Sequence, residues 1–238
     1  MLLLICIFVE STSSKLSPIS PLPPISIPNF RQVSPLIPHL YRSLTLDAAT
    51  ASAAGALLSL NVTRVINLRN SDEVPPSLSP GLEALYAAGV ELVHIHLMDV
   101  DGLFLSPASF LPPMKRAQAY WFFAFNPNTR EHDGLIVEEI AAKGNRVLYK
   151  SIMKSARKAV AEAVAEGCSG EEGGAVVVFC QKGKDRTGIV AALAAARAGE
   201  EEGEIVRQYA MSEALLRKGG VAGAPQKPSE GGMDRERR

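Results

Sequence analysis

The sequence has few cysteines, no net charge and no long hydrophobic run, and each of these absences excludes a class of protein. Its three cysteines show neither the paired spacing of a zinc site nor that of a small disulfide framework, which favours a reducing compartment. Lysine plus arginine numbers 25, as does aspartate plus glutamate, so no overall field draws the chain to nucleic acid or to an anionic membrane. Any charge-driven recognition must therefore be local.

The apolar stretch at the start, residues 2–9, is too short to span a bilayer. It also lacks the basic flank and the clear cleavage site of a signal peptide. We therefore expect a cytoplasmic protein without stable membrane insertion, although this apolar start leaves targeting open.

Composition divides the chain into three parts. Residues 1–28 are rich in serine and proline and predict a flexible leader, and residues 219–238 combine glycine, proline and charge in a way that predicts a disordered tail. Residues 29–218 lie between them and are long enough for one hydrophobic core.

Apolar patterns of helical period alternate with short runs rich in β-branched residues across this central part. Strands that alternate with helices predict an α/β fold with a mostly parallel central sheet flanked by helices. We expect helices at residues 46–60, 81–89 and 145–166, the second turning at Gly89 and the third ended by Gly167, and strands at residues 62–69, 90–98 and 175–180.

The segment AVVVFCQKGKDRTGIVAALAAA carries the most chemical information in the chain. A buried strand ends at Cys180, a short polar loop follows, and an alanine-rich helix begins near Thr187. Backbone N–H groups of such a loop turn towards one anion, and the positive end of the helix points to the same place. Gly183 permits the bend, and Gly188 allows the helix start to pack closely against the strand. We expect the phosphate of a substrate to be bound by Gln181, Lys182, Gly183, Lys184 and Arg186.

The spacing of Cys180 and Arg186 places a sulfur and a guanidinium on two sides of one phosphate. The electrostatic field of the loop amides and of the helix start favours the thiolate, which is the nucleophilic form of cysteine. We therefore predict attack of Cys180 on phosphorus, a phosphocysteine intermediate, and hydrolysis of that intermediate by water without metal or cofactor. Thr187 is placed to donate its hydroxyl to the sulfur as it leaves.

The leaving oxygen needs a proton, and two places in the chain compete to supply it. Asp185 lies in the loop itself, whereas Asp99 and Asp101 follow a predicted strand and approach the loop from above. Asp185 also has a purely structural reading, in which it forms a salt bridge with Lys184 or another nearby cation.

Other interpretations of the loop fit less well. A nucleotide-binding P-loop requires Gly and Ser or Thr where this chain has Val178 and Asp185. A rhodanese-like sulfurtransferase loop is typically shorter and does not need Arg186. A merely buried Cys180 leaves the KGKDR cluster unexplained.

The loop CQKGKDRTG resembles the signature loop of the protein tyrosine phosphatase superfamily, in the variant of an atypical branch of tyrosine/serine phosphatases. The resemblance implies that Cys180 is the nucleophile, that Arg186 binds phosphate and that Asp185 is the acid, since this branch tends to lack a separate acid loop. It also implies phosphotyrosine as substrate, and in some members phosphoserine, phosphothreonine or phosphoinositides. Further pieces similar to that branch are Asn29-Phe30-Arg31, Leu40-Tyr41-Arg42-Ser43, residues 65–69 followed by Asp72-Glu73, and residues 209–213.

Two features depart from that family or add to it. The family usually has His before the nucleophile, whereas this chain has Phe179, which motivates a second hypothesis of a weak or inactive phosphate-binding module. The run Tyr120-Trp121-Phe122-Phe123 either forms an aromatic wall over a phosphotyrosine pocket or packs in the core, and we expect the core. His94, His96 and His132 are not expected to bind a metal.

Overall fold

The computed structural model describes residues 25–97, 108–125, 134, 135, 138, 142, 144, 146–170 and 174–218. The predicted leader before residue 25, the predicted tail from residue 219, and Asp99, Asp101 and His132 lie outside these ranges. Of the residues assigned to the leader, Ile27 joins the core and the carbonyl of Pro28 accepts a hydrogen bond from the backbone N–H of Leu44.

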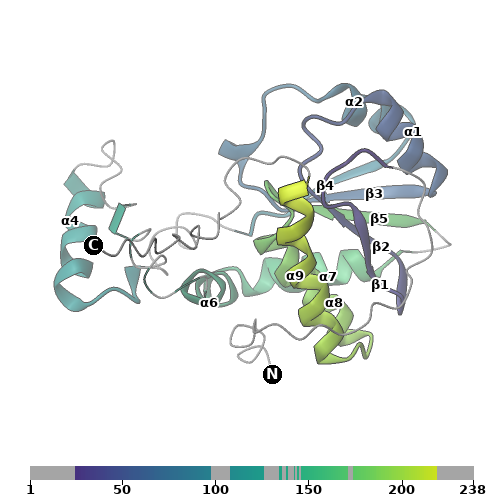
Figure 1. The fold of residues 1–238 in the computed structure, drawn as a ribbon. Helices are drawn as coiled ribbons and strands as arrows, with labels where there is room; N and C mark the ends of the chain where they lie inside the picture. The colour runs from purple at the N-terminus through teal and green to yellow at the C-terminus, as the bar shows by residue number, and fades with distance from the viewer. Residues whose placement is uncertain are drawn as a thin grey trace, which may run out of the picture.

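The described strands form one sheet in the order β1-β2-β5-β3-β4 (Figure 1). β1 and β2 are antiparallel, and the other neighbouring strands are parallel, so the predicted α/β fold with a mostly parallel central sheet is confirmed. The strands are β1 (Arg31–Ser34), β2 (Ile37–Ser43), β3 (Val62–Asn67), β4 (Glu91–His94) and β5 (Ala175–Phe179).

Helices cover both faces of the sheet. α1 and α2 pack on one face, and α6, α7, α8 and α9 contribute to the core on the other (Figure 1). Capping explains two of their starts, because Thr50 and Ser79 accept hydrogen bonds from the backbone N–H groups of Ala53 and Leu82. The helices are α1 (Ala51–Ser59), α2 (Pro80–Ala87), α4 (Pro113–Phe125), α6 (Arg146–Ser155), α7 (Arg157–Cys168), α8 (Asp185–Arg197) and α9 (Glu202–Lys218), with a short 3₁₀ helix, η1 (Ser71–Glu73).

β5 is the central strand of the sheet, and all five of its residues are buried. Its side chains alternate between the two cores: Val176 and Val178 face α7 and α8, whereas Val177 and Phe179 face α1 and α2. Residues 175–180 are all apolar, without the alternation of apolar and polar residues seen in a half-exposed strand, and this pattern correctly predicted a central strand.

The long helix predicted over residues 145–166 is in fact two helices, α6 and α7, which meet at Ala156. The hydroxyl of Ser155 donates to the carbonyl of Ser151 in the last turn of α6 (2.8 Å), a contact that bends helices. Gly167 does not end α7, which continues to Cys168. The missing side chain of Gly167 makes room for Leu40, whose Cδ1 would lie 3.3 Å from an added Cβ. The expected helix end at Gly167 is therefore wrong.

The expectation that the aromatic run is packed in the core is wrong for part of α4. Tyr120, Trp121 and Phe125 are exposed, and only a small cluster around Ala119 and Leu111 covers the inner side of the helix. Figure 1 shows α4 at the left, well apart from the sheet. Among the described helices, none is long and apolar enough to cross a membrane.

Candidate active site

The predicted loop follows the central strand at the carboxyl edge of the sheet. Cys180 comes directly after β5, is almost fully buried and is a free thiol. α8 begins at Asp185, two residues before the predicted start, so the loop between strand and helix is only five residues long, 180–184. The structure thus brings the carboxyl end of a strand and the amino end of a helix together at Cys180.

Gly183 determines the shape of this loop. Its φ of +61° is in the left-handed region, and a Cβ there would lie 1.9 Å from the backbone oxygen of Ser43. The side chains of Asn29 and Arg42 both donate to its carbonyl at 2.8 Å. Because the C=O and N–H of a trans peptide point in opposite directions, the N–H of Lys184 is directed away from these donors.

Arg42, in β2, lies beneath the loop and is almost fully buried. Burial lowers the pKa of its guanidinium to about 10, although the negative charges of Cys180 and Asp185 act to raise it. The guanidinium therefore stays charged at neutral pH and places a cation under the loop. Arg42 was noted in the sequence only as part of a motif similar to the family, with no role. A charged residue inside an apolar strand is rarely buried without a partner, so this position could have indicated a supporting role.

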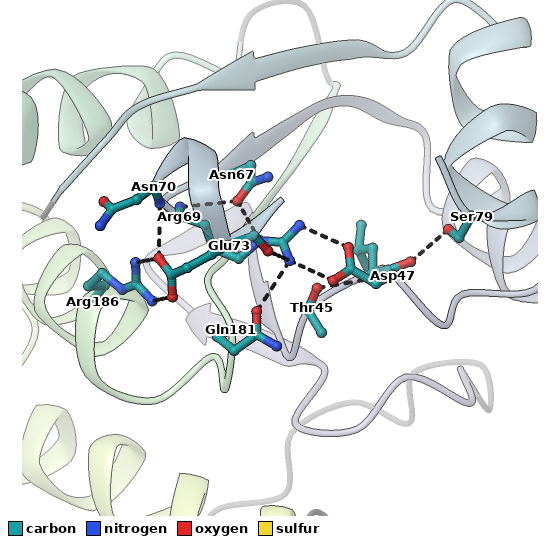
Figure 2. Close-up of polar contacts among 10 residues, drawn as sticks. Thr45, Asp47, Asn67, Arg69, Asn70, Glu73, Ser79, Gln181 and Arg186 are labelled. Carbon is teal, nitrogen blue, oxygen red and sulfur yellow. Dashed lines mark hydrogen bonds and ion pairs between the residues drawn. The ribbon is translucent and has the colours of Figure 1, made fainter. Parts of the chain in front are cut away.

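Arg186 lies in the first turn of α8 and forms a two-pronged ion pair with Glu73 of η1 (Figure 2). Its Nη2 donates to Oε1 of Glu73 at 2.6 Å, and its Nη1 donates to Oε2. Burial lowers the pKa of Arg186, but the bonds to Glu73 and the negative charge of Cys180 outweigh burial, so the pKa lies above its usual value. Cys180 and Arg186 are therefore close enough to act on one phosphate.

Glu73 had been noted only for its resemblance to a family motif, with no role. Its carboxyl pKa would be raised by burial, but the hydrogen bonds from Arg186 and from the backbone of Asn70 lower it below the usual range. Glu73 is thus the ionised partner that holds Arg186 in place.

A third buried arginine, Arg69, also supports the loop (Figure 2). Arg69 binds Asp47 through both Nη atoms, and its Nη1 also donates to the side chain of Gln181 at 3.2 Å. The same Nη1 donates to the backbone carbonyl of Glu73 at 3.1 Å. Arg69 therefore links the loop to the segment that holds Arg186.

Phe179, which replaces the histidine expected in the family, faces away from the nucleophile. It is buried in the core against α1 and α2, whereas Cys180 belongs to the opposite core. The guanidinium of Arg69 lies 5.4 Å from the centre of its ring. Phe179 thus supports the loop through Arg69 and Gln181, because its ring has no hydrogen-bonding group of its own.

Asp185 is held by two tyrosines from different helices. The hydroxyl of Tyr149, in α6, donates to Oδ1 of Asp185 at 2.5 Å, and that of Tyr209, in α9, donates to the same atom at 3.3 Å. The two hydroxyls also contact each other, and because each has a single proton, that of Tyr209 is shared between the oxygen of Tyr149 and Oδ1 of Asp185. Burial and the charge of Asp185 raise the pKa of both tyrosines above its usual value, so both remain protonated donors. No salt bridge between Asp185 and Lys184 occurs among the described ion pairs, but the charge of Asp185 acts on another nearby cation, Arg42, where it opposes the lowering of the pKa by burial.

Tyr149 was not predicted as a site residue, because nothing local in the sequence connects a helical tyrosine to a residue 36 positions away. The neighbour nearest to Gly188 is a helix, because a Cβ there would lie 2.7 Å from the ring of Tyr209 in α9, and the next is Nη2 of Arg42 in β2 at 3.6 Å.

The remaining predicted residues differ in exposure. Gln181 and Lys182 are exposed, Lys184 is half-buried, and Thr187 is fully buried. The hydroxyl of Thr187 has no hydrogen-bond partner within the described part of the chain, so its proton is not engaged by another described side chain. His94 and His96 are exposed, and no cluster of metal-ligating side chains occurs among the described residues.

Comparisons with known proteins agree with this geometry. The model of the tyrosine phosphatase family matches residues 30–230, which include the sheet, the loop and all the described helices. A search of curated proteins finds no match. The family match covers well over half of the chain, from β1 onwards and with the Cys180 loop inside it. The chain therefore belongs to the tyrosine phosphatase family and has the role of a phosphatase.

Proposed function

We propose that this protein is a metal-independent phosphatase that hydrolyses phosphotyrosine through a phosphocysteine on Cys180. One observation carries the proposal: a buried free thiol lies at the start of a helix beside an arginine that Glu73 holds in position. A helix amino end and an arginine fork are together suited to a dianionic phosphate.

The guanidinium of Arg186 has enough N–H donors to bind both Glu73 and the phosphate of a substrate. Glu73 engages one N–H of each Nη atom. An arginine has five N–H donors, and the carbonyl of Leu68 accepts a further one from Nη1 at 3.4 Å, so Nε–H and the second N–H of Nη2 remain to form another fork. We assign that fork to two equatorial oxygens of the phosphate, with the loop amides on the others.

In the first step the sulfur of Cys180 attacks phosphorus, and the bond from phosphorus to the substrate oxygen breaks. Asp185 gives its proton to the leaving oxygen. Tyr149 and Tyr209 both donate to Oδ1, which supports Oδ2 as the atom that carries this proton. In the second step Asp185 takes a proton from water, the water oxygen bonds to phosphorus, and the thiolate of Cys180 leaves, with Thr187 donating to it.

Lys182 and Lys184 lie in the loop and would add to its attraction for a multiply charged phosphate. Besides phosphotyrosine, we therefore propose phosphoserine, phosphothreonine and phosphoinositides as further substrates to test. The thiolate mechanism requires reduced cysteine, and both described cysteines, Cys168 and Cys180, are free, which supports the expected cytoplasmic location.

The test is hydrolysis of p-nitrophenyl phosphate in EDTA and reductant, comparing the wild type with Cys180→Ser and with Cys168→Ser as the matched control. We expect turnover in the wild type and in Cys168→Ser, and none in Cys180→Ser. Turnover that survives Cys180→Ser would refute the mechanism.

A second candidate function is a phosphate-binding module without turnover, which the position of Phe179 favours. Phe179 gives the loop no hydrogen bond, and its support passes through Arg69 and Gln181 instead. A folded wild type that binds inorganic phosphate and shows no turnover on any phosphate ester would establish this alternative.

A further inference from the structure

α4 presents large apolar side chains to solvent on one side. Met114 is 84% exposed, Trp121 53% and Phe125 70%. Trp121 and Phe125 follow Met114 by seven and eleven residues, about two and three turns of helix, so all three lie on one face. The opposite face carries Ala119, which is fully buried. Met114, Trp121 and Phe125 therefore form an exposed apolar stripe along α4.

The aromatic rings in this stripe contact one another. The ring centre of Trp121 lies 5.8 Å from that of Phe125 and 5.4 Å from that of Phe122. Within the described residues, no strand and no other helix packs extensively against α4. An indole ring with a polar N–H beside phenylalanine and methionine is suited to a boundary between water and an apolar phase.

A local cluster of positive charge lies on the next described helices, α6 and α7. The sequence from Arg146 to Ala161 contains five lysines and arginines and no acidic residue. Among the described ion pairs, none involves any of these five cations. Figure 1 shows α6 between α4 and α7, so α6, which carries three of the five cations, is the nearer of the two basic helices to α4 in this view. These cations, which we call the basic segment, are Arg146, Lys150, Lys154, Arg157 and Lys158.

We infer that the stripe of α4 and the basic segment together bind the surface of an anionic lipid bilayer. Exposed aromatic side chains enter the headgroup region, and each nearby lysine or arginine adds attraction to anionic lipids. A second copy of the chain is a poorer occupant, because a two-fold contact through this face would bring the two basic segments together. The inference goes beyond the proposed function and does not rest on it, since binding is measured without turnover.

The chain has one tryptophan, Trp121, which makes its fluorescence a specific reporter. We expect a blue shift of the emission, and co-sedimentation of the full chain, with vesicles of phosphatidylcholine and phosphatidylserine. Vesicles of phosphatidylcholine alone, or added salt, should weaken both signals, because salt screens the basic segment.

Three variants separate the contributions. Met114→Ser with Phe125→Ser should lower the affinity for vesicles at least about tenfold, since two apolar side chains no longer enter the lipid. Lys154→Gln with Lys158→Gln should lower the affinity for anionic vesicles by about tenfold and leave the weak binding to neutral vesicles unchanged. The matched control is Tyr86→Ser, whose side chain is 67% exposed on α2 and should not affect binding.

Three results would overturn the inference. The first is no co-sedimentation and no blue shift in the folded wild type. The second is co-sedimentation that all variants retain without a blue shift, which would assign binding to the apolar residues 2–9 instead. The third is a blue shift that depends on protein concentration and needs no lipid, which would identify a second copy as the occupant.

Discussion

Gly183 is the residue on which the loop depends most directly at the scale of single side chains. Its backbone is in a conformation that side chains rarely adopt, and the space beside it is filled by the backbone of Ser43. The same glycine carbonyl receives the hydrogen bonds of Asn29 and Arg42. A change at this one position therefore displaces the anchor of the whole loop.

We predict that Gly183→Ala lowers the free energy of unfolding by about 3 kcal/mol or more and removes measurable turnover, because the methyl group meets the Ser43 carbonyl. Gly199→Ala is the matched control. Gly199 has a φ of +88° but no atom within 4 Å of an added Cβ. Gly199→Ala should therefore lower the free energy of unfolding by only about 1 kcal/mol and keep turnover. Urea unfolding and p-nitrophenyl phosphate hydrolysis measure both quantities. Equal effects in the two variants would show that the contact with Ser43 is unimportant.

Tyr149 acts through Asp185 and is a positioning residue in our mechanism. We predict that Tyr149→Phe lowers kcat about tenfold and changes KM little, because the carboxyl group loses the hydroxyl that orients it. Tyr86→Phe, at an exposed position of α2, should change neither constant. A variant with unchanged kcat would remove Tyr149 from the mechanism and weaken the assignment of Asp185 as the acid.

At the scale of elements, the short helix η1 matters more than its three residues suggest. It holds Glu73 against Arg186 and, through the Glu73 carbonyl, contacts Arg69. The loop before α8 and the segment after β3 are therefore fastened to each other by two arginines.

We predict that Glu73→Gln lowers the free energy of unfolding at neutral pH by about 1 kcal/mol, since the pair is partly exposed. The pKa of Glu73 is lowered in the folded state, so its stabilisation is present above the usual carboxyl pKa and is lost as pH falls through the lowered value. The difference between wild type and variant should therefore disappear in acid. Urea unfolding across the acid range measures it.

Glu213→Gln is the control for this series, because the Glu213–Arg217 pair on α9 is exposed on both sides. It should change stability by less than about 0.5 kcal/mol at neutral pH. A difference for Glu73→Gln that persists unchanged in acid would contradict an ionised Glu73 as the source of the effect.

At the scale of the whole molecule, Arg31 joins the edge of the sheet to the last helix. Its Nη2 donates to the carbonyl of Gln208 and to the hydroxyl of Ser212, both at 2.7 Å. Its Nη1 donates to the carbonyl of Asn29, whose side chain binds Gly183. β1, α9 and the active-site loop are thus connected through one buried guanidinium.

We predict that Arg31→Met lowers the free energy of unfolding by about 2–4 kcal/mol, because buried acceptors on α9 lose their donor. Hydrogen exchange should show lost protection in α9 before the sheet opens. Arg217→Met, at an exposed site of the same helix, should have little effect. Full protection of α9 in Arg31→Met would show that apolar packing alone holds the helix.

Short-range patterns in the sequence were enough to predict much of this molecule. The apolar run of β5, the alternation of strands and helices, and the step from Cys180 to Arg186 are local properties, set by backbone period and by a tight turn. The helix break at Ala156 and the exposed face of α4 were not predicted, because both depend on what neighbouring elements cover.

By itself, then, the sequence determined the α/β class and the loop that carries the proposed chemistry. Only the tertiary structure decided which side chains support that loop: Glu73 reaches Arg186 across 113 residues, and Arg42 reaches Gly183 across 141. The physical reason is the strand order, in which β5 lies between β2 and β3. That order brings the ends of distant segments to one edge of the sheet, and no local period in the sequence records it.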